Sequence, residues 1–221
     1  MAQWSRYTSY VMRESTLGTK RRREAYHHGS LHEAVLVAAW DLVSESGVAQ
    51  LSLRECARRA GVSHAAPAYH FGSRQGLVDE IAKMAYTKLI AAIDEWSAKE
   101  GDGIMGCGLG YVAFAKAWPR QFELILGLDR SSVTPDALSA IRREAIGRLS
   151  GAIRDVWTEV NGRPPSEAVL SRRTVLGWSA AHGFASLLVG AMGTPVRVPP
   201  AREVFAPLRS ALITDRAPVR D

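Results

Sequence analysis

The segment from Ser52 to Phe71 constrains the fold most, because it has room for only two short helices and a tight turn. Ser52 and Glu55 have the spacing of a capping box, which marks the start of a helix. Gly61 can end that helix, since a residue without Cβ adopts the left-handed conformation at least cost. The pattern predicts a helix, a turn and a second short helix capped by Ser63. In a helix-turn-helix unit of this kind the second helix enters the major groove of DNA.

The second short helix carries three alanines, although a DNA-binding helix is expected to carry larger side chains. Ala65 and Ala66 would let the backbone approach the base pairs, and an alanine can contact a thymine methyl group. Pro67 is expected about one turn into the helix, where it would remove the first intrahelical hydrogen bond. The residues of this segment that are predicted to contact DNA are Ser63, His64, Ala65 and Tyr69.

The rest of the chain predicts helices throughout. Apolar residues recur at helical spacing from Ser30 to Glu45, and Ser73 caps a long amphipathic helix. Further helices are expected at about 109–117, 119–127, 135–160, 166–192 and 201–213. No alternating strand pattern occurs, so the predicted fold is all-α. It comprises an N-terminal three-helix helix-turn-helix domain and a C-terminal helical domain for ligand binding and dimerisation.

Composition suggests where these parts meet. The stretch GDGIMGCGLG, residues 101–110, is rich in glycine and predicts a linker. It also contains a GxGxxG string, but a dinucleotide fingerprint follows a buried strand, and here a charged helix end precedes it. The expected division is a basic arm at 1–28, the DNA-binding domain at 29–76, a connecting helix and glycine-rich linker at 77–103, and the C-terminal domain at 104–221.

The positive charge is concentrated near the N-terminus. Residues 1–28 carry a net charge of +4 and residues 52–75 one of +3, whereas residues 29–51 carry −3, in a chain whose net charge is +6. This distribution favours contact with a polyanion. The basic run lies just before the first helix, as minor-groove arms do, although a solvated tail with nonspecific attraction fits equally well. The run consists of Lys20, Arg21, Arg22 and Arg23.

Four residues at helix starts could hold phosphates without reading sequence. They are Ser52, Arg54, Ser73 and Arg74. Simple capping is the alternative for the two serines, and both roles are compatible.

The segment LHEAVLVAAWDLVSESGVAQLSLRECARRAGVSHAAPAYHFGSRQGLVDEI resembles the N-terminal DNA-binding domain of the TetR family of transcriptional regulators over about residues 26–82. YHHGSLHEAV, YVAFAKAWPRQFELILG and WSAAHGF resemble the branch with a C-terminal Trp-His-Gly signature, here Trp178, His182 and Gly183. The chain departs from the family at Ala68, where a tyrosine is usual, and at Arg74, where a lysine is usual. The displacement leaves open whether Tyr69 contacts phosphate or a base.

The resemblance implies a dimeric repressor that a small-molecule effector of unknown identity releases from a palindromic double-stranded operator. An effector-independent DNA-binding protein is the alternative, and a helical enzyme a third. No nucleophile with a placed base and no carboxylate pair can be assembled from the motifs, so catalysis is not expected. No cofactor is expected either. His28 and His32 lack a third ligand of suitable spacing, which argues against a metal site.

The C-terminal domain offers two sets of candidate residues. Aromatic residues and one histidine could line an effector cavity or form plain core: Tyr111, Phe114, Trp118, Phe122, Trp157, Trp178 and His182. Small residues between 166 and 192 could let two subunits approach closely through the last two helices: Gly177, Ala180, Ala181, Ala185, Ser186 and Gly190, with Leu187 and Leu188 adding apolar area. Packing within one subunit is the alternative for this second set.

Residues 174–191 are uncharged apart from His182, but they are rich in Gly, Ala and Ser and predict a buried helix rather than a membrane span. Cys56 and Cys107 lie far apart and favour free thiols in a reducing compartment, so a cytoplasmic location is expected.

Overall fold

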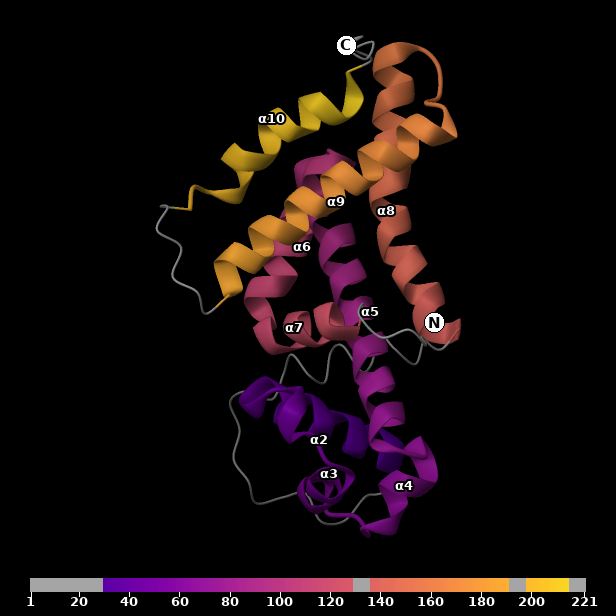
Figure 1. Ribbon diagram of the computed structural model, residues 1–221, viewed down its shortest axis with the longest axis vertical. Helices are drawn as coiled ribbons and strands as arrows, with labels where there is room; N and C mark the ends of the chain where they lie inside the picture. The colour runs from indigo at the N-terminus through magenta and orange to yellow at the C-terminus, as the bar shows by residue number, and fades with distance from the viewer. Residues whose placement is uncertain (1–29, 129–135, 191–197, 215–221) are drawn as a thin grey trace.

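The structure is a computed structural model that describes residues 30–128, 136–190 and 198–214. These residues form helices and no strand, which confirms the all-α prediction. The labels follow Figure 1, where the described helices begin at α2. The elements are α2 (Ser30–Ser46), the 3₁₀ helix η1 (Val48–Gln50), α3 (Leu53–Ala60), α4 (Ala65–Phe71), α5 (Arg74–Glu100), α6 (Gly103–Ala117), α7 (Pro119–Leu128), α8 (Asp136–Asn161), α9 (Glu167–Val189) and α10 (Ala201–Ile213).

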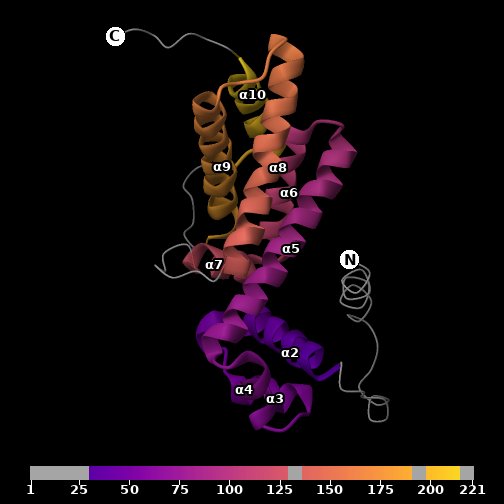
Figure 2. The same cartoon turned by 90° about the vertical axis from the view of Figure 1, so that its right-hand side faces the viewer.

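The helices form two parts stacked along the long axis of the molecule (Figures 1 and 2). Helices α2, α3 and α4 make up the lower part, and α5 runs from it into the upper part, where it packs against α6 and α8. Helix α7 lies at the base of the upper part and contacts α2. The larger of two apolar clusters extends through both parts, because it includes buried residues of α2, α5, α6 and α7.

The glycine-rich stretch is not a linker, and that prediction is wrong. Helix α6 begins at Gly103. Asp102 caps its start, because Asp102 Oδ1 accepts a hydrogen bond from the Met105 N–H at 2.9 Å. Gly106 and Gly110 lie one turn apart and face α5. A Cβ added at Gly106 would come within 2.2 Å of the Ser97 Cα, and one at Gly110 within 2.6 Å of the Ile93 Cα. The two glycines therefore allow close packing of α6 on α5.

The helix predicted over 166–192 is observed as α9, which covers most of the uncharged stretch. Within the three described ranges, no helix is long and apolar enough to cross a membrane. The basic run at residues 20–23, together with His27 and His28, lies outside the described residues.

Candidate functional site

The turn between α3 and α4 has the geometry that its sequence predicts. The Ser52 hydroxyl accepts the Glu55 N–H at 3.2 Å, which caps the start of α3. Gly61 ends the helix with φ of 70°. The Gly61 N–H donates to the Arg58 carbonyl at 3.3 Å and the Val62 N–H to the Ala57 carbonyl at 3.1 Å, so two carbonyls in the last turn of α3 are satisfied.

Helix α4 starts one residue later than expected, after His64, and no side chain caps it. The prediction that the Ser63 side chain caps this helix is therefore wrong, although the Ser63 carbonyl accepts the Ala66 N–H at 3.1 Å. Pro67 is the third residue of α4. The N–H groups of the first turn have no intrahelical acceptor, so Pro67 removes no hydrogen bond, contrary to our expectation. Its ring is buried instead.

The residues at the start of α4 that are predicted to contact DNA share one exposed surface. Ser63, His64 and Ala65 are exposed, and Tyr69 is 87% exposed with its ring edge-on to His70 at 5.3 Å. Pro67 and Phe71 point the other way and are buried. Helix α4 is thus held to the core by one face and presents the opposite face, with a large aromatic side chain, to the surroundings. Ala68, at the position where the family usually has tyrosine, is exposed beside Tyr69.

Arg74 has a structural partner that the sequence did not suggest. Its Nε donates to the Leu51 carbonyl at 2.8 Å and its Nη2 to the Val48 carbonyl at 2.5 Å. The Arg74 guanidinium therefore stabilises the connection between α2 and α3. Because both acceptors are uncharged carbonyls, these bonds do not neutralise its positive charge. At the same helix start the Ser73 hydroxyl accepts the Gly76 N–H at 3.1 Å, so Ser73 is a cap as predicted.

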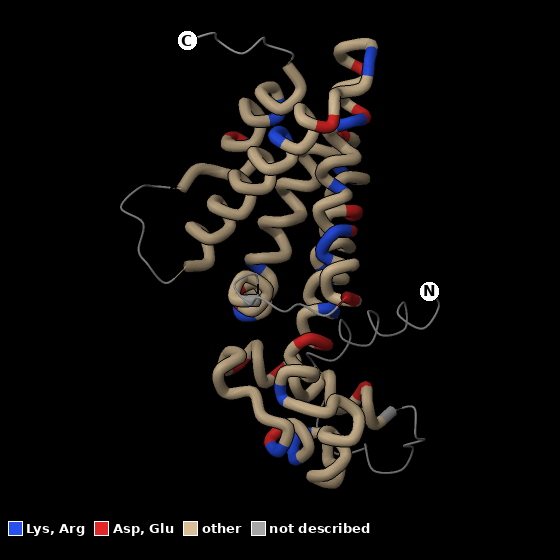
Figure 3. The backbone as a smooth tube through the Cα atoms, turned by 45° about the vertical axis from the view of Figure 1, so that its right-hand side comes forward, with Lys and Arg blue, Asp and Glu red and all other residues tan. Residues whose placement is uncertain are grey.

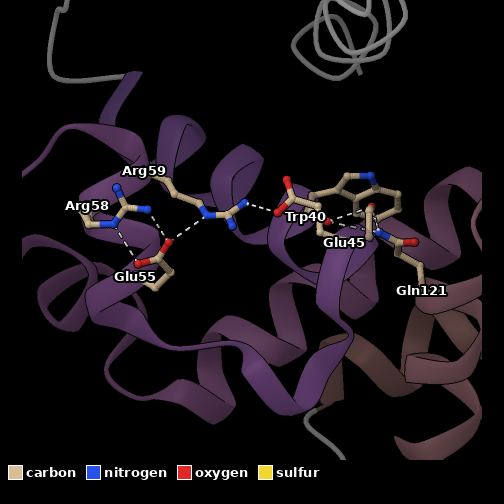
Figure 4. A network of polar contacts seen from close by, with 7 residues as sticks. Trp40, Glu45, Glu55, Arg58, Arg59 and Gln121 are labelled. Atoms are coloured by element: carbon tan, nitrogen blue, oxygen red, sulfur yellow. Dashed lines mark hydrogen bonds and ion pairs between the residues drawn. The ribbon is translucent and has the colours of Figure 1, made fainter.

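Two arginines of α3 are paired with carboxylates (Figure 4). Arg58 contacts both carboxylate oxygens of Glu55, at 2.9 and 2.6 Å. Arg59 forms two ion pairs, one with Glu55 at 3.0 Å and one with Glu45 of α2 at 2.8 Å. Hydrogen bonds from Arg58 and Arg59 lower the pKa of Glu55 to about 2.

Figure 3 shows that Lys or Arg positions lie next to Asp or Glu positions in the lower part of the molecule. Arg54 is exposed at the start of α3 and has no acidic partner among the described residues. Arg54 is therefore better placed than Arg58 or Arg59 to attract phosphate.

The upper part contains a cavity of about 70 Å³ bounded by α5 to α10. Three of the predicted residues border it, namely Tyr111, Trp178 and His182. The Tyr111 hydroxyl lies 2.9 Å from His182 Nδ1. The other four do not border it: Phe114, Phe122 and Trp157 are buried in the packing, and Trp118 lies against Trp40.

Sequence reasoning considered aromatic residues for the cavity and missed two arginines that border it. Arg142 lies on α8 and Arg209 on α10, where its Nε donates to Asp102. A helical-periodicity argument could have found Arg142, because it shares a face with Ala145 and Leu149, which also border the cavity.

A buried polar contact joins the two parts of the molecule. Gln121 of α7 is 1% exposed, and its amide donates to the Trp40 carbonyl at 3.2 Å and to the Ser44 hydroxyl at 2.5 Å. The ammonium group of Lys88 lies 5.4 Å from the Trp40 ring centroid and 5.0 Å from the Trp118 ring centroid. Burial lowers the pKa of Lys88. Ile125 and Leu126, about one turn beyond Gln121, border the cavity. Helix α7 therefore touches both the cavity and α2.

Several small residues of α9 face inward. Ala181 and Ala185 are buried, and a Cβ added at Gly177 would meet Leu212 at 3.2 Å and Leu149 at 3.3 Å. The prediction that these three residues form the dimer face is therefore wrong, because they lie on the side of α9 that packs within the subunit. The outer face of α9 carries a different, exposed set: Val175, Leu176, Ser179, Gly183 and Leu187.

Residues 35–81 match the family model "Bacterial regulatory proteins, tetR family", and residues 104–213 match "Tetracyclin repressor-like, C-terminal domain". The chain is 28% identical over 153 residues to the HTH-type transcriptional regulator AlkX of Mycobacterium tuberculosis, which covers 66% of this chain and 71% of that protein.

The fold is similar to a solved structure of a protein with unknown function from Rhodococcus sp. RHA1, with a TM-score of 0.71 and 28% identity over 86% of this chain and 97% of that one. It is also similar to NalD, the secondary repressor of the MexAB-OprM multidrug efflux pump in Pseudomonas aeruginosa, with a TM-score of 0.52 and 17% identity over 85% and 98% of the two chains. The two family matches and the helix-turn-helix geometry show that this chain belongs to the TetR family and is a DNA-binding transcriptional regulator.

Proposed function

We propose that the protein is a cytoplasmic repressor that binds a palindromic operator as a symmetric dimer and leaves it when a small molecule enters the cavity. The observation that carries this proposal is the position of α7, which borders the cavity through Ile125 and Leu126 and holds α2 through Gln121. A change at the cavity wall can therefore move the helix-turn-helix.

DNA reading is assigned to the exposed face of α4. His64, Ala65 and Tyr69 would meet base edges, and Arg54 with the N-terminal ends of α3 and α5 would hold phosphates. Arg74 contributes its positive charge to the same surface, although two of its N–H groups already donate to backbone carbonyls. One such unit makes few base contacts, so specificity favours two units related by a two-fold axis.

The dimer contact is assigned to the outer face of α9. Val175 is 55% exposed, Leu176 44% and Leu187 56%, and they follow one side of the helix with Gly183 between them. A Cβ added at Gly183 would meet nothing within 4 Å in the subunit, so a second helix could pack closely there. Exposed apolar patches of this kind mark interaction surfaces.

The size of the cavity explains how a ligand would act. At about 70 Å³ it is smaller than the cavity of about 150 Å³ that accommodates benzene in an engineered protein. A larger effector would have to displace α7, α8 or α9, and the Gln121 contact would transmit a displacement of α7 to α2. By linkage, DNA must weaken effector binding by the same factor by which the effector weakens DNA binding.

A reporter assay tests the proposal. The full-length protein is expressed with its selected operator placed between a promoter and a reporter gene, and we expect lower expression that a small molecule restores. Increased expression would contradict the repressor role. If no compound changes DNA affinity, the effector-independent alternative would replace the proposal.

A further inference from the structure

We infer that the cavity accepts an uncharged, mainly apolar molecule, and that the ion pair between Asp102 and Arg209 gives it this specificity. The inference rests on the proposed function only in taking the cavity as the effector site.

The cavity wall is built mainly from apolar side chains. Helices α5, α6, α8 and α10 all contribute to it, for example with Ile93, Ile104, Met105, Leu149 and Phe205. A ligand that leaves water for such a wall gains from the burial of its apolar surface.

The charge of Arg209 at this wall is offset by a neighbouring carboxylate. Arg209 lies on α10 and borders the cavity, and its Nε donates to Oδ2 of Asp102 at the start of α6. The side chain of Asp102 is 20% exposed and that of Arg209 33%, so water screens this pair only partly. Arg142, on α8, also borders the cavity and has an interaction of its own. Both guanidinium groups are therefore engaged before a ligand arrives.

Other polar groups at the wall are also satisfied or uncharged. The Tyr111 hydroxyl lies 2.9 Å from His182 Nδ1, so a ligand that bonds to one of these atoms has to displace the other. Cys107 is 6% exposed, and burial raises the pKa of its thiol to about 12, so the thiol carries no charge near neutral pH.

A charged ligand would therefore lose its hydration without gaining a free partner. An anion would have to compete with Asp102 for Arg209, and a cation would find no Asp or Glu among the described residues that border the cavity. Burial of an unpaired charge is far more costly than burial of an apolar group. The wall therefore favours a neutral molecule.

The two carboxylate oxygens of Asp102 have separate roles. Oδ1 accepts the Met105 N–H and caps α6, whereas Oδ2 accepts from Arg209. Asparagine is also a good N-cap residue, because its amide oxygen can accept the same backbone N–H. In Asp102→Asn an NH2 donor replaces the oxygen that Arg209 contacts. This substitution can therefore release Arg209 while the cap of α6 is kept.

Three probes with the same eight-carbon chain test the ligand class: 1-octanol, octanoate and octylamine. Binding to the full-length protein is measured by calorimetry at about pH 7, where the carboxylate and the amine are both ionised. We expect 1-octanol to bind at least about tenfold more tightly than either ion. Equal or tighter binding of octanoate or octylamine, or no binding of 1-octanol below about 1 mM, would overturn the inference.

Asp102→Asn tests the role of the ion pair. The released Arg209 can bond to a carboxylate, so octanoate should bind about tenfold more tightly than to the wild type, with little change for 1-octanol. Glu100→Gln is the matched control. It breaks the ion pair between Glu100 and Arg202, whose exposed side chain does not border the cavity, and should leave all three affinities unchanged.

A double variant shows whether Arg209 causes the gain. Asp102→Asn combined with Arg209→Gln should bind octanoate as weakly as the wild type does, because no guanidinium has been released. Circular dichroism checks that the variants are folded, and the wild-type probe series remains decisive if they are not. A folded Asp102→Asn with unchanged octanoate affinity, or a gain that persists in the double variant, would contradict the role of the ion pair.

DNA binding separates this inference from the proposed function. If 1-octanol binds with the expected preference but leaves DNA affinity unchanged, the proposed effector role fails and the ligand class stands. If octanoate or octylamine releases DNA as effectively as 1-octanol, the effector role stands and the ligand class fails.

Discussion

The side-chain amide of Gln121, on α7 in the upper part, donates a hydrogen bond to the backbone carbonyl of Trp40, on α2 in the DNA-binding part, at 3.2 Å. Gln121 is 1% exposed, so this contact is shielded from water. It is the most direct polar connection between the cavity-bearing helices and the helix-turn-helix among the described residues, and it gives the first prediction.

Gln121→Ala should uncouple ligand binding from DNA binding. The Trp40 carbonyl and the Ser44 hydroxyl lose a buried partner, which should cost about 1–3 kcal/mol of unfolding free energy. The ratio of DNA dissociation constants with and without a releasing ligand should fall toward one. Arg120→Ala, at the exposed neighbouring position, is the matched control. An unchanged ratio in Gln121→Ala would show that the signal passes elsewhere.

Arg74→Ala and Arg74→Lys should both destabilise the helix-turn-helix. Alanine has no donor, and lysine lacks the two separate nitrogens that bond to the Leu51 and Val48 carbonyls, so the loss should be about 1 kcal/mol for this exposed group. Urea unfolding measures this. Arg74→Lys retains the charge, so it should lower DNA affinity less than Arg74→Ala, on all sequences alike. Wild-type stability in both variants would mean that Arg74 acts only on phosphate.

Tyr69→Ala and His64→Ala should change operator preference with little effect on stability. Both side chains are exposed, so unfolding free energies should stay within about 0.5 kcal/mol of wild type. Titrations on matched and mismatched duplexes compare sequence preference. Equal losses on every duplex would assign these side chains to phosphate contact instead.

Leu187→Arg should separate the dimer without unfolding the subunit, because Leu187 is 56% exposed on the outer face of α9. Ala185→Arg should unfold the protein instead, since Ala185 is fully buried in the subunit. Ser210→Arg, at an exposed position of α10, is the control. Light scattering gives the oligomeric state and circular dichroism the fold. A dimeric Leu187→Arg would exclude this face.

Local signals predicted local structure well. The capping serines at 52 and 73 and the left-handed Gly61 act within a few residues, so their geometry can be inferred from neighbouring letters alone. The cap at Ser63 was wrong because helix α4 starts one residue later, with Pro67 buried in its first turn.

Features that depend on distant residues could not be predicted. Gly106 and Gly110 suggest flexibility by composition, and only the approach of α5 shows that they are packing positions. The same holds for Gly177, whose neighbours Leu149 and Leu212 are remote in sequence. Arg74 likewise binds carbonyls 23 and 26 residues away. Tertiary packing also decides which of the seven candidate residues border the cavity. Tyr111, Trp178 and His182 do, and the other four do not.

The central claim, that two copies of the exposed α4 face read one operator, is tested most directly by selecting binding sites from a pool of random duplexes with the full-length protein. The account predicts an enriched palindrome whose half-sites are centred roughly 34–36 Å apart, one helical turn, or a multiple of that spacing. Selection of a single asymmetric site by a protein that is monomeric in light scattering, or no enrichment at all, would contradict it.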